Sequence, residues 1–457
     1  MEALSKALEY KVTHSEAFLS ELKDFLRIPS ISTLPENAGD VKSAADFLCT
    51  KLISLGVEHV QAFPTARHPI IYGDYLHAGA DQPNALIYGH YDVQPVDPID
   101  LWTHPPFDPT REGDYLYARG ASDMKGQVWA VLSAIESIMK SGEFPINLKF
   151  LIEGEEEIGS LNFPGFLKDH KELLQASFAL NADTGMIAKD VPTIVFGLRG
   201  LAYFEIRVNG PSHDLHSGVY GGVVQNPAQV LADLISGMRD QEGVVKLPGF
   251  YDKVLPISSQ ERMELNRLNM NEAYYQQQTG VPEVWGEKGY TPVERTGARP
   301  TLDVNGLLSG FTGEGAKTVI PAWAMAKLST RLVPNQKPDD VHQQLIQFMK
   351  EHAPATVTWS IKMLSGGDPS ISEINTPECQ ALAESLRQVW GVKPTYKREG
   401  GSVPVVADMQ QILGFDSVLT GFGLPDDNIH SPNEKLHLPT WYKGMEALIR
   451  FFFIVRK

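Results

Sequence analysis

The chain has 457 residues, of which 42% are hydrophobic and 21% are charged. This length predicts two or three domains whose cores are large enough to be stable without disulfides. The formal net charge of −16 argues against a nucleic-acid partner, because phosphate binding needs clustered Lys and Arg. The two cysteines, Cys49 and Cys379, lack CxxC or CxxH spacing, so we expect reduced thiols in a reducing compartment.

The N-terminal segment has the pattern of amphipathic helices and not that of a targeting sequence. Leucine and phenylalanine recur at helical spacing through the first 26 residues, among side chains of both charges. Pro29 and Pro35 then interrupt the helical pattern between about Ser15 and Val60, which predicts two helices joined by a loop. No apolar run approaches the roughly 18 residues needed to span a bilayer. We therefore expect a cytoplasmic protein without a membrane partner.

Short apolar runs alternate with helical patterns in the next part of the chain. The apolar runs are HPIIYGDY, NALIYGHYDV and NLKFLIEGEEE. The helical stretches are MKGQVWAVLSAIESIMKSG and FLKDHKELLQA. Strands that alternate with helices are typical of an α/β sheet with helices on both faces.

After Gly197 the pattern changes to that of strands with one exposed face. LAYFEIRVNG, WAMAKLSTRLVP and ATVTWSIKML have the alternation of strands, whereas NPAQVLADLISGM and DDVHQQLIQFMKEH have that of helices. The stretch from Glu242 to Arg299 is polar and predicts loops and small helices. This combination indicates a separate α+β domain whose sheet has one exposed face.

The α/β character returns from about Thr376, with a helix followed by SVPVVADMQQILG and FDSVLTGFG. We therefore predict one α/β domain, residues 1–200 and 370–457, interrupted by an inserted α+β domain, residues 201–369. In α/β sheets, functional sites form beyond the carboxyl ends of strands. Acidic and imidazole residues at such ends are accordingly the candidates for a site.

Two of the candidate segments are ALIYGHYD and RGASDMKG. His90 and Asp92 follow an apolar run with a spacing that places both side chains on one side of an extended chain. A carboxylate beside a ligating imidazole fixes its tautomer, although a structural histidine is the alternative. Asp123 lies just before an apolar helix, where the alternative role is a helix cap.

Three further segments carry carboxylates or an imidazole after apolar runs. EGEEEIGS contains Glu155, Glu156 and Glu157, which form either a solvated charge run or a pair with one ligand and one proton carrier. Asp183 in NADTG and His430 in NIHSPNEK would each, taken alone, be interpreted as turn residues. Together, two histidines and several carboxylates suit a pair of divalent metals, and favour zinc, manganese or cobalt over magnesium or calcium.

Seven segments, in this order along the chain, resemble the metallopeptidase family of carnosine dipeptidases, carboxypeptidase G and succinyl-diaminopimelate desuccinylase. They are GHYDVQP, RGASDMKG, GLRG, HSGVYGG, TRLVPN, REGGSVPV and HSPNEK. The resemblance covers nearly the whole chain and is closest to the cytosolic nonspecific dipeptidase branch. It implies an α/β catalytic domain with a phosphorylase/hydrolase-like mixed sheet, helices on both faces, and an inserted α+β lid or dimerisation domain. A homodimer that pairs through the inserted domain is therefore expected.

The resemblance also implies a role for each candidate residue in a two-metal site. Asp123 bridges two metal ions, which are zinc or manganese, with cobalt as a third candidate. Asp92 orients His90, and Glu156 is the general base that acts on a metal-bridged water to give hydroxide. Glu155 falls where the family is variable. The remaining ligands are His90 and Asp183 on one metal and Glu157 and His430 on the other.

Residues of the inserted domain and of the C-terminal segment match substrate contacts of the family. His216, in HDLHSG, matches a histidine that reaches across a dimer to the substrate carbonyl of the neighbouring subunit. Arg331 matches an arginine that binds the substrate's carboxylate, a task for which the forked guanidinium is suited. The glycine-rich segment REGGSVPV resembles a substrate loop, with Ser402 as the first candidate contact and Glu399 as the second.

We thus expect metal-dependent hydrolysis of dipeptides or short peptides that have a free C-terminal carboxylate, with Glu156 as general base. One alternative is an N-acyl amino acid amidohydrolase of the deacetylase or desuccinylase type. It would use the same metals and would differ in the half of the substrate that lacks the carboxylate. A second alternative is a noncatalytic binding module, which would be expected to lose metal ligands or the base, whereas this chain keeps all of them.

Overall fold

The computed structural model describes residues 2–401 and 403–456, and the chain divides into two compact units. Unit 1 comprises Met1–Phe196, Ser372–Lys397 and Asp408–Lys457, and unit 2 comprises Gly197–Ile371 and Arg398–Ala407. The short segment between the second and third parts of unit 1 thus groups with unit 2. The assignment of catalytic and dimerisation roles to these units stays a prediction.

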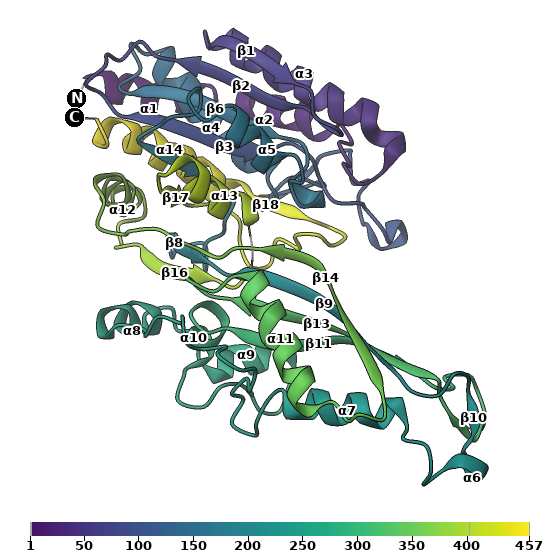
Figure 1. The fold of residues 1–457 in the computed structure, drawn as a ribbon. Coiled ribbons are helices and arrows are strands. Elements are labelled where there is room, and N and C mark those ends of the chain that lie inside the picture. Colours follow the sequence, from purple (N-terminus) through teal and green to yellow (C-terminus); the bar gives the residue numbers. More distant parts are fainter. Residues whose placement is uncertain (1, 402, 457) are drawn as a thin grey trace. The chain divides into compact units, whose positions relative to one another are not determined.

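The largest sheet has most of its strands in unit 1 (Figure 1). Its strands occur in the order β1 (Glu58–Phe63), β2 (Ile70–Tyr75), β6 (Asn147–Glu153), β3 (Asn84–His90), β7 (Phe178–Asn181), β17 (Ser417–Leu419), β8 (Thr193–Leu198) and β15 (Ser370–Ile371), with β16 (Thr395–Glu399) paired to β8. The four central strands β6, β3, β7 and β17 are parallel, whereas β1, β2 and β8 pair in the antiparallel sense. The predicted mixed sheet is therefore confirmed.

Helices cover both faces of this sheet, as its continuous apolar strands require. The helices concerned include α4 (Lys125–Met139) and α5 (Phe163–Asp169). An added Cβ on Gly89 would lie only 2.7 Å from Val128 Cγ2 of α4, so β3 and α4 approach closely there. The ring of Tyr88 instead contacts Phe163 of α5, with centroids 5.7 Å apart. Because successive strand residues point to opposite faces, α4 and α5 cover opposite faces of β3.

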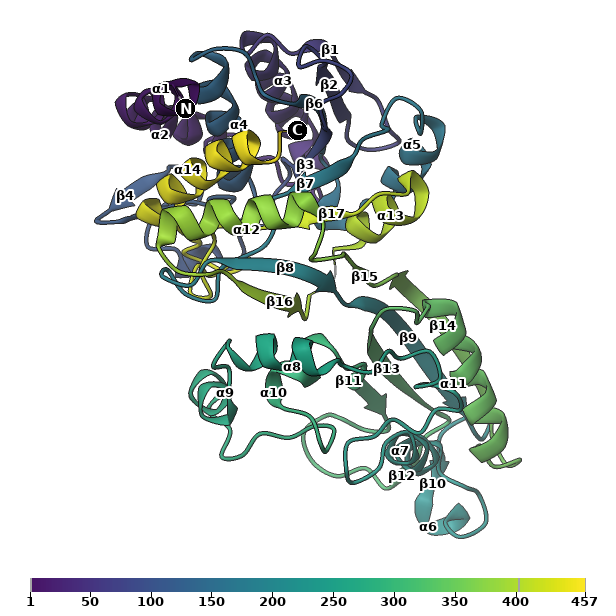
Figure 2. The ribbon, with the colours of Figure 1, turned by 90° about the vertical axis from the view of Figure 1, so that its left-hand side faces the viewer.

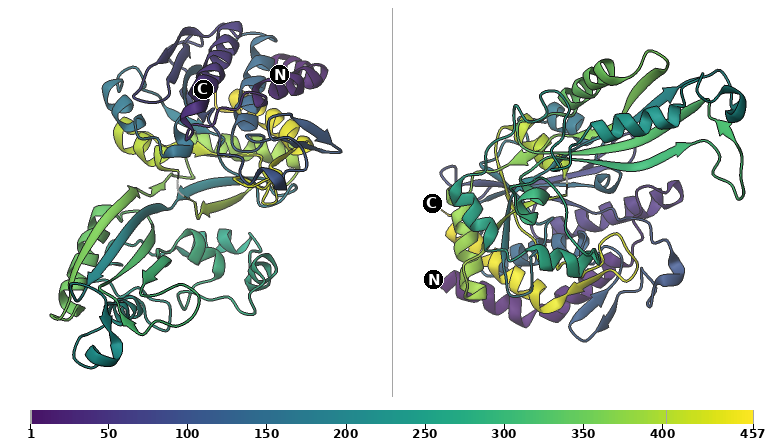
Figure 3. Two further views of the ribbon diagram at one scale, coloured as in Figure 1. Left: turned by 90° about the vertical axis from the view of Figure 1, so that its right-hand side faces the viewer. Right: turned by 90° about the horizontal axis from the view of Figure 1, so that it is seen from below.

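The described residues of unit 1 form further long helices besides α4. They are α1 (Glu2–Thr13), α2 (Ser15–Leu26), α3 (Ala38–Ser54), α12 (Pro377–Trp390), α13 (Pro404–Leu413, split between the units) and α14 (Leu438–Ile454). The Trp129 ring of α4 packs between Phe25 of α2 and Phe47 of α3, with centroids 5.6 Å from each. α14 packs against α1, α4 and α12, so the first and last helices of the chain are neighbours (Figures 2 and 3).

The sequence pattern predicts helix through residue 176, but α5 ends at Asp169. The chain turns at His170, whose ring packs on Phe166 and Phe63 with centroids 4.3 and 4.9 Å away. This contact and the burial of Leu174 hold the segment after Asp169 in place without further helical turns. A small sheet of β4 (Thr110–Glu112), β5 (Tyr115–Tyr117) and β18 (Lys435–His437) has no counterpart in the sequence prediction.

Unit 2 contains a four-stranded antiparallel sheet in the order β11 (Thr301–Ser309), β13 (Trp323–Leu332), β9 (Gly200–Asn209) and β14 (Thr358–Gly367). Every second residue of β9 and β13 is buried. The helices α7 (Pro227–Gly237) and α11 (Pro338–His352) pack against this sheet and contribute to its core with Leu231 and Leu345. The predicted strand pattern with one exposed face is confirmed.

The polar stretch of unit 2 forms short helices, as its composition predicts. These are α8 (Ser259–Asn266), α9 (Glu272–Thr279) and α10 (Pro292–Gly297). The strands β10 (Leu215–His216) and β12 (Val319–Ile320) form a two-stranded ribbon, and the single-turn helix α6 (Ser217–Tyr220) follows β10 directly. Among the helices of the described residues, none combines the length and the apolar character that crossing a membrane requires.

Candidate metal centre

The central parallel strands bring the candidate segments to one edge of the sheet. His90, the last residue of β3, is in register with Glu153, the last residue of β6. On its other side, Tyr88 of β3 is in register with Asn181 at the end of β7. The EGEEEIGS segment follows β6 directly, and Asp183 follows β7 by two residues. Parallel strands thus deliver these side chains to a single site, as sheet topology requires.

Asp123 lies between two imidazoles, and each of its carboxylate oxygens faces one of them. Its Oδ1 is 3.2 Å from Nε2 of His90, and its Oδ2 is 2.9 Å from Nε2 of His430. The N-cap position of α4 is Met124, without a side-chain cap, so the alternative that Asp123 caps this helix is wrong. A carboxylate with one oxygen toward each of two imidazoles has the arrangement of a bridging ligand.

Glu157 and Asp183 flank this central group on opposite sides. Glu157 Oε2 lies 3.2 Å from Nε2 of His430 and accepts a hydrogen bond of 2.7 Å from the side-chain amide of Gln94. Asp183 Oδ2 lies 3.9 Å from Nε2 of His90. The structure therefore groups Glu157 with His430 and Asp183 with His90, around the shared Asp123.

The three consecutive glutamates have three different environments. Glu155 is buried and accepts hydrogen bonds from Thr65 Oγ1, the His68 backbone N–H and the Asn162 side chain, so it holds the local fold together. Glu157 belongs to the metal group. Glu156 begins the short helix η3 (Glu156–Ile158) and is half-buried. A solvated charge run does not describe this segment.

The pKa of the Glu156 carboxyl is raised well above its ordinary value, chiefly by burial. The charge of His90 acts in the opposite direction, and the charges of Asp183 and Glu157 add to the rise. Burial of this kind, which favours the protonated form of a carboxyl, is typical of carboxyls that act in general acid–base catalysis. The environment of Glu156 is thus suited to proton transfer.

Asp92 fixes both His90 and the glutamate segment. Nδ1 of His90 lies 3.1 Å from the Asp92 carbonyl oxygen and 3.3 Å from its Oδ1. The same carboxylate accepts hydrogen bonds from the backbone N–H groups of Glu156 and Glu157, at 3.3 and 3.0 Å. Contacts of Nδ1 with Asp92 leave Nε2, which faces Asp123, as the nitrogen that can bind a metal ion.

The donor set carries more negative charge than its imidazoles can neutralise. Burial raises the pKa of Asp183 to about 7, and burial likewise raises the pKa of Glu157. The hydrogen bond to Asp123 raises the pKa of His430 to about 10. Crowded buried carboxylates of this kind need nearby cations. Two divalent ions with mixed imidazole and carboxylate ligation therefore fit this site.

The sequence did not predict a role for Glu434, whose carboxylate binds the backbone of the loop that carries Asp123. It is fully buried and accepts hydrogen bonds from Nη1 of Arg119 (2.8 Å) and from the N–H groups of Gly120, Ser122 and Asp123 (3.0, 2.9 and 3.0 Å). The position of this glutamate within the segment HSPNEK was the one sequence feature that could have indicated its role. Its partner Arg119 is 315 positions away, so only the fold reveals the pair.

The predicted substrate contacts His216, Arg331 and Glu399 belong to unit 2, whereas the residues of the metal centre belong to unit 1. His216 is exposed, and its Nδ1 accepts a hydrogen bond of 3.0 Å from the N–H of Gly218. Arg331 is half-buried in β13 and lines a cavity. Glu399 ends β16 and accepts a hydrogen bond from the N–H of Gly400. Ser402 lies outside the described residues.

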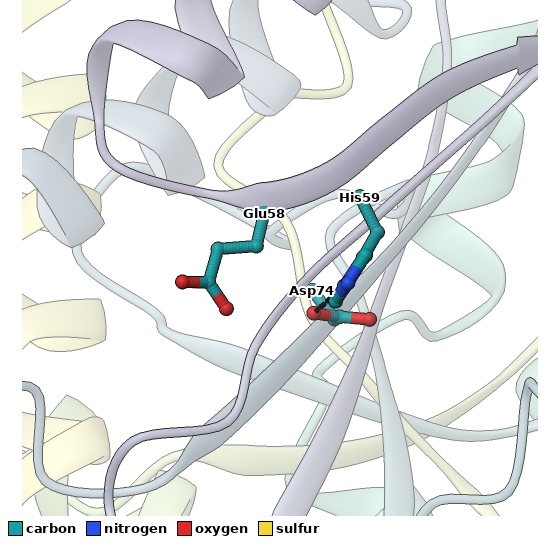
Figure 4. A group of neighbouring side chains, drawn as sticks. All are labelled: Glu58, His59 and Asp74. Atoms are coloured by element: carbon teal, nitrogen blue, oxygen red, sulfur yellow. Dashed lines mark hydrogen bonds and ion pairs between the residues drawn. The ribbon is translucent and has the colours of Figure 1, made fainter.

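A second group with metal-ligand chemistry lies on β1 and β2 (Figure 4). Its members are Glu58, His59 and Asp74, which offer ligand atoms within 4.8 Å of one another. Nδ1 of His59 lies 2.9 Å from Oδ1 of Asp74, whose Oδ2 accepts a hydrogen bond from the Tyr72 hydroxyl. The His59 side chain is 74% exposed, so this group is a surface histidine–aspartate pair with a neighbouring glutamate.

Comparison with known proteins agrees with the geometry of the buried centre. The profile of peptidase family M20/M25/M40 matches residues 86–453. The Cys-Gly metallodipeptidase DUG1 of Candida albicans is 31% identical over 453 residues, which cover 94% of this chain and 93% of that protein. Human Beta-Ala-His dipeptidase is 28% identical, over 98% of this chain and 92% of that protein.

Solved structures agree in fold over almost the full length. The M20 family metallo-carboxypeptidase Sso-CP2 from Sulfolobus solfataricus gives a TM-score of 0.85 at 34% identity, over 96% of this chain and 99% of that chain. Human carnosine dipeptidase 1 gives a TM-score of 0.80 at 28% identity, over 99% and 98% of the two chains. The sequence profile, the full-length relatives and the arrangement of His90, Asp123 and His430 lead to one conclusion. This chain belongs to peptidase family M20/M25/M40.

Proposed function

We propose that this protein is a two-metal dipeptidase that hydrolyses dipeptides and short peptides with a free C-terminal carboxylate. The observation that carries the proposal is the position of Asp123 between His90 and His430, with Glu156 and Glu157 on the adjacent turn. The relatives support it, since the Candida albicans protein is named for Cys-Gly and the human protein for Beta-Ala-His. Both names denote dipeptides.

Two divalent ions, when bound, would supply the Lewis acidity that lowers the pKa of the attacking water. His90, Asp183 and Asp123 would hold one ion, and Glu157, His430 and Asp123 the other. We propose zinc or manganese, with cobalt as a third candidate, because this ligand set mixes imidazoles with carboxylates.

Glu156 is the proposed general base. It takes a proton from the attacking water and returns it to the leaving amine, and its raised pKa suits both steps. His216 is proposed to donate a hydrogen bond to the developing oxyanion across a homodimer. Arg331 is proposed to bind the C-terminal carboxylate of the substrate, with Ser402 and Glu399 as further contacts. We also propose that the protein is cytoplasmic and pairs through unit 2.

The amidohydrolase alternative differs in the substrate's amino end. An N-acyl amino acid has no free amino group, whereas a dipeptide has one. The names of two relatives denote dipeptides, and a third is named a metallo-carboxypeptidase, which is a class of enzyme that acts at a peptide C-terminus. A free C-terminus is thus the feature common to these substrates.

The experiment compares Ala-Ala with its N-acetylated and C-amidated forms, using enzyme that has been demetallated and then reloaded with manganese or zinc. We expect hydrolysis of Ala-Ala only after metal is restored, and poor hydrolysis of both blocked forms. Faster hydrolysis of the N-acetylated form would identify an amidohydrolase instead. Full activity of exhaustively demetallated enzyme would remove the two-metal mechanism.

A further inference from the structure

Unit 1 contains a cavity of about 310 Å³ that is separate from the metal centre. Its walls come from β7, β8 and β17 and from the first turn of α12, and all the described residues that line it belong to unit 1. None of them is a residue of the metal centre. Ser417 of the lining is in register with Ala179, which precedes the proposed ligand Asp183 by roughly 13 Å of extended chain. The cavity is therefore a second concave site in the same unit.

The cavity lies where the pairing between two neighbouring strands stops. β17 pairs with β7 along its whole length, from Ser417 to Leu419, but it pairs with β8 only where Leu419 faces Val195. At the next residue β8 bonds to a different segment, because the carbonyl oxygen of Phe196 accepts a hydrogen bond of 2.8 Å from the N–H of Ser372. The sheet therefore opens between β8 and the start of β17.

The buried part of the lining is apolar. Its side chains are all more than nine-tenths buried and include those of Phe178, Ile194, Val195, Val418 and Leu419. Cys379 also lines the cavity, and burial raises the pKa of its thiol to about 12, so this group is uncharged near neutral pH. An apolar cavity of about 150 Å³ holds one benzene molecule. This cavity therefore has room for a ring with a short side chain.

One buried polar group of the lining has no hydrogen-bond partner among the described residues. It is the hydroxyl of Ser417, a residue that is only 3% exposed. Burial of a hydroxyl without a hydrogen bond is unfavourable, so such a group in a native structure needs an explanation. Because Ser417 lines the cavity, a polar atom of a bound ligand can be the partner of its hydroxyl.

The more exposed part of the lining is acidic. It includes the carboxylates of Glu373, Glu378 and Asp416, and the described lining residues include no lysine, arginine or histidine. Asp416 is fixed, because its Oδ1 accepts a hydrogen bond of 2.7 Å from Nε2 of Gln410 and its Oδ2 accepts one of 3.0 Å from the N–H of Glu373. The N-terminus of α12 opposes these charges with only about half a positive charge. The field in the cavity therefore favours a cation.

We propose that this cavity binds a small primary amine with an apolar body, at a site separate from the metal centre. The apolar body packs against the buried strands, and the ammonium group lies among the carboxylates. An ammonium has three N–H donors, for which the carboxylates of Glu378 and Asp416 and the hydroxyl of Ser417 are the acceptors. Free amino acids and dipeptides fit this site less well, because their own carboxylate is repelled by the lining. The inference does not depend on the proposed function.

The test measures the binding of 2-phenylethylamine and of 2-phenylethanol to the full-length, metal-loaded protein by isothermal titration calorimetry. The two probes have nearly the same shape, but only the amine is charged near neutral pH. Charge-assisted hydrogen bonds to carboxylates contribute enough to expect an affinity at least about 10-fold higher for the amine, with one molecule bound per chain. Absence of saturable binding of the amine, or equal affinity for the two probes, would overturn the proposal.

Two variants and a matched control assign the binding to this cavity. Ser417→Ala should weaken binding of the amine by about 5-fold or more without lowering the melting temperature of the free protein, because the hydroxyl has no partner there to lose. Glu378→Gln should weaken binding of the amine and leave that of the alcohol unchanged. Glu384→Gln is the control, because Glu384 lies on the same helix but pairs with Arg387 outside the cavity, at 2.7 Å. Wild-type affinity for the amine in both Ser417→Ala and Glu378→Gln would refute the assignment.

Discussion

The buried centre and the surface group on β1 and β2 contain the same kinds of residue in similar geometry. In each, an imidazole nitrogen lies close to an aspartate oxygen, 3.2 Å for His90 and Asp123 and 2.9 Å for His59 and Asp74. The difference is the burial of the imidazole, because the His90 side chain is 0% exposed and that of His59 is 74% exposed, whereas both aspartates are largely buried. Water screens the charge of the His59 imidazole, so this pair needs no ion to compensate it.

The two groups also differ in what holds them. In the buried centre, Asp92 and Glu434 accept hydrogen bonds from backbone N–H groups of the segments that carry the ligands. In the surface group, Asp74 is held by the Tyr72 hydroxyl of its own strand. A metal site needs ligands that are fixed before the ion binds. The hydrogen bonds that hold the ligands therefore distinguish the two groups better than the distances between ligand atoms do.

The comparison predicts its largest difference for the two aspartates. Asp123→Ala should lower kcat/KM by more than about 10²-fold. The change removes the carboxylate that lies between the two imidazoles, and metal-dependent catalysis contributes several kcal/mol. Asp74→Ala should leave kcat/KM within a factor of about two, since changes outside a site rarely act on catalysis. Kinetics with Ala-Ala and metal analysis of both variants provide the measurement. Comparable losses in the two variants would contradict the comparison.

Within the buried centre, substitution of the adjacent residues Glu156 and Glu155 should distinguish a catalytic role from a structural one. Glu156→Gln should lower kcat by at least about 10²-fold, the scale of general acid–base catalysis, and metal content should stay near that of the wild type. Glu155→Gln is the matched change at the structural neighbour and should mainly lower the melting temperature. Loss of metal from Glu156→Gln would show that the ligand and base roles of Glu156 and Glu157 are exchanged.

A smaller effect is expected at Glu434, which touches no substrate. Glu434→Gln keeps the shape but removes the charge that pairs with Arg119 and that accepts the Asp123 N–H. Supporting partners of this kind typically contribute 10–100-fold to metal affinity. We expect a weaker metal affinity on roughly this scale, measured by competition with a chelator, and activity that excess metal restores. Activity that stays low at saturating metal would mean that Glu434 acts on the reaction itself.

Much of the buried centre follows from the sequence, because its residues stand directly at strand ends. His90 and Asp183 come after apolar runs, and parallel strands must bring such positions to one edge. The roles of Glu155 and Glu434 do not follow, since each depends on partners distant in the chain, such as Thr65 and Arg119. The hairpin of β4 and β5 was missed for a related reason, because strands of three residues carry too few positions to show alternation.

A cavity of unit 2 that is lined by several arginines, Arg331 among them, shows the same limit. The resemblance selected Arg331 alone, whereas Arg199, Arg239 and Arg295 come from other parts of the chain and meet only in the fold. Periodicity predicts β9 and β13 well, because each strand carries its own alternation of buried and exposed residues. It carries no information about which loops surround the ends of those strands. Local patterns thus predict elements, while sites assembled from several loops require the structure.

The smallest predicted effect concerns the surface pair itself. The hydrogen bond to Asp74 raises the pKa of His59, so the folded protein holds this proton more tightly than the unfolded chain does. The resulting stabilisation is fully present below the unfolded pKa of about 6.5 and is lost as the pH rises through the folded pKa. His59→Gln should therefore lower the melting temperature slightly at pH 5.5 and by less at pH 8.5.

An NMR titration of the His59 ring measures the same linkage directly. Its midpoint should lie above the ordinary histidine value in the wild type and should fall in Asp74→Asn, which removes the charge and keeps the shape. The metal content of the loaded enzyme should be the same in His59→Gln as in the wild type, because the exposed imidazole of His59 is screened by water and its pair with Asp74 needs no ion. Loss of a bound ion in His59→Gln would show that burial is not what distinguishes the two groups.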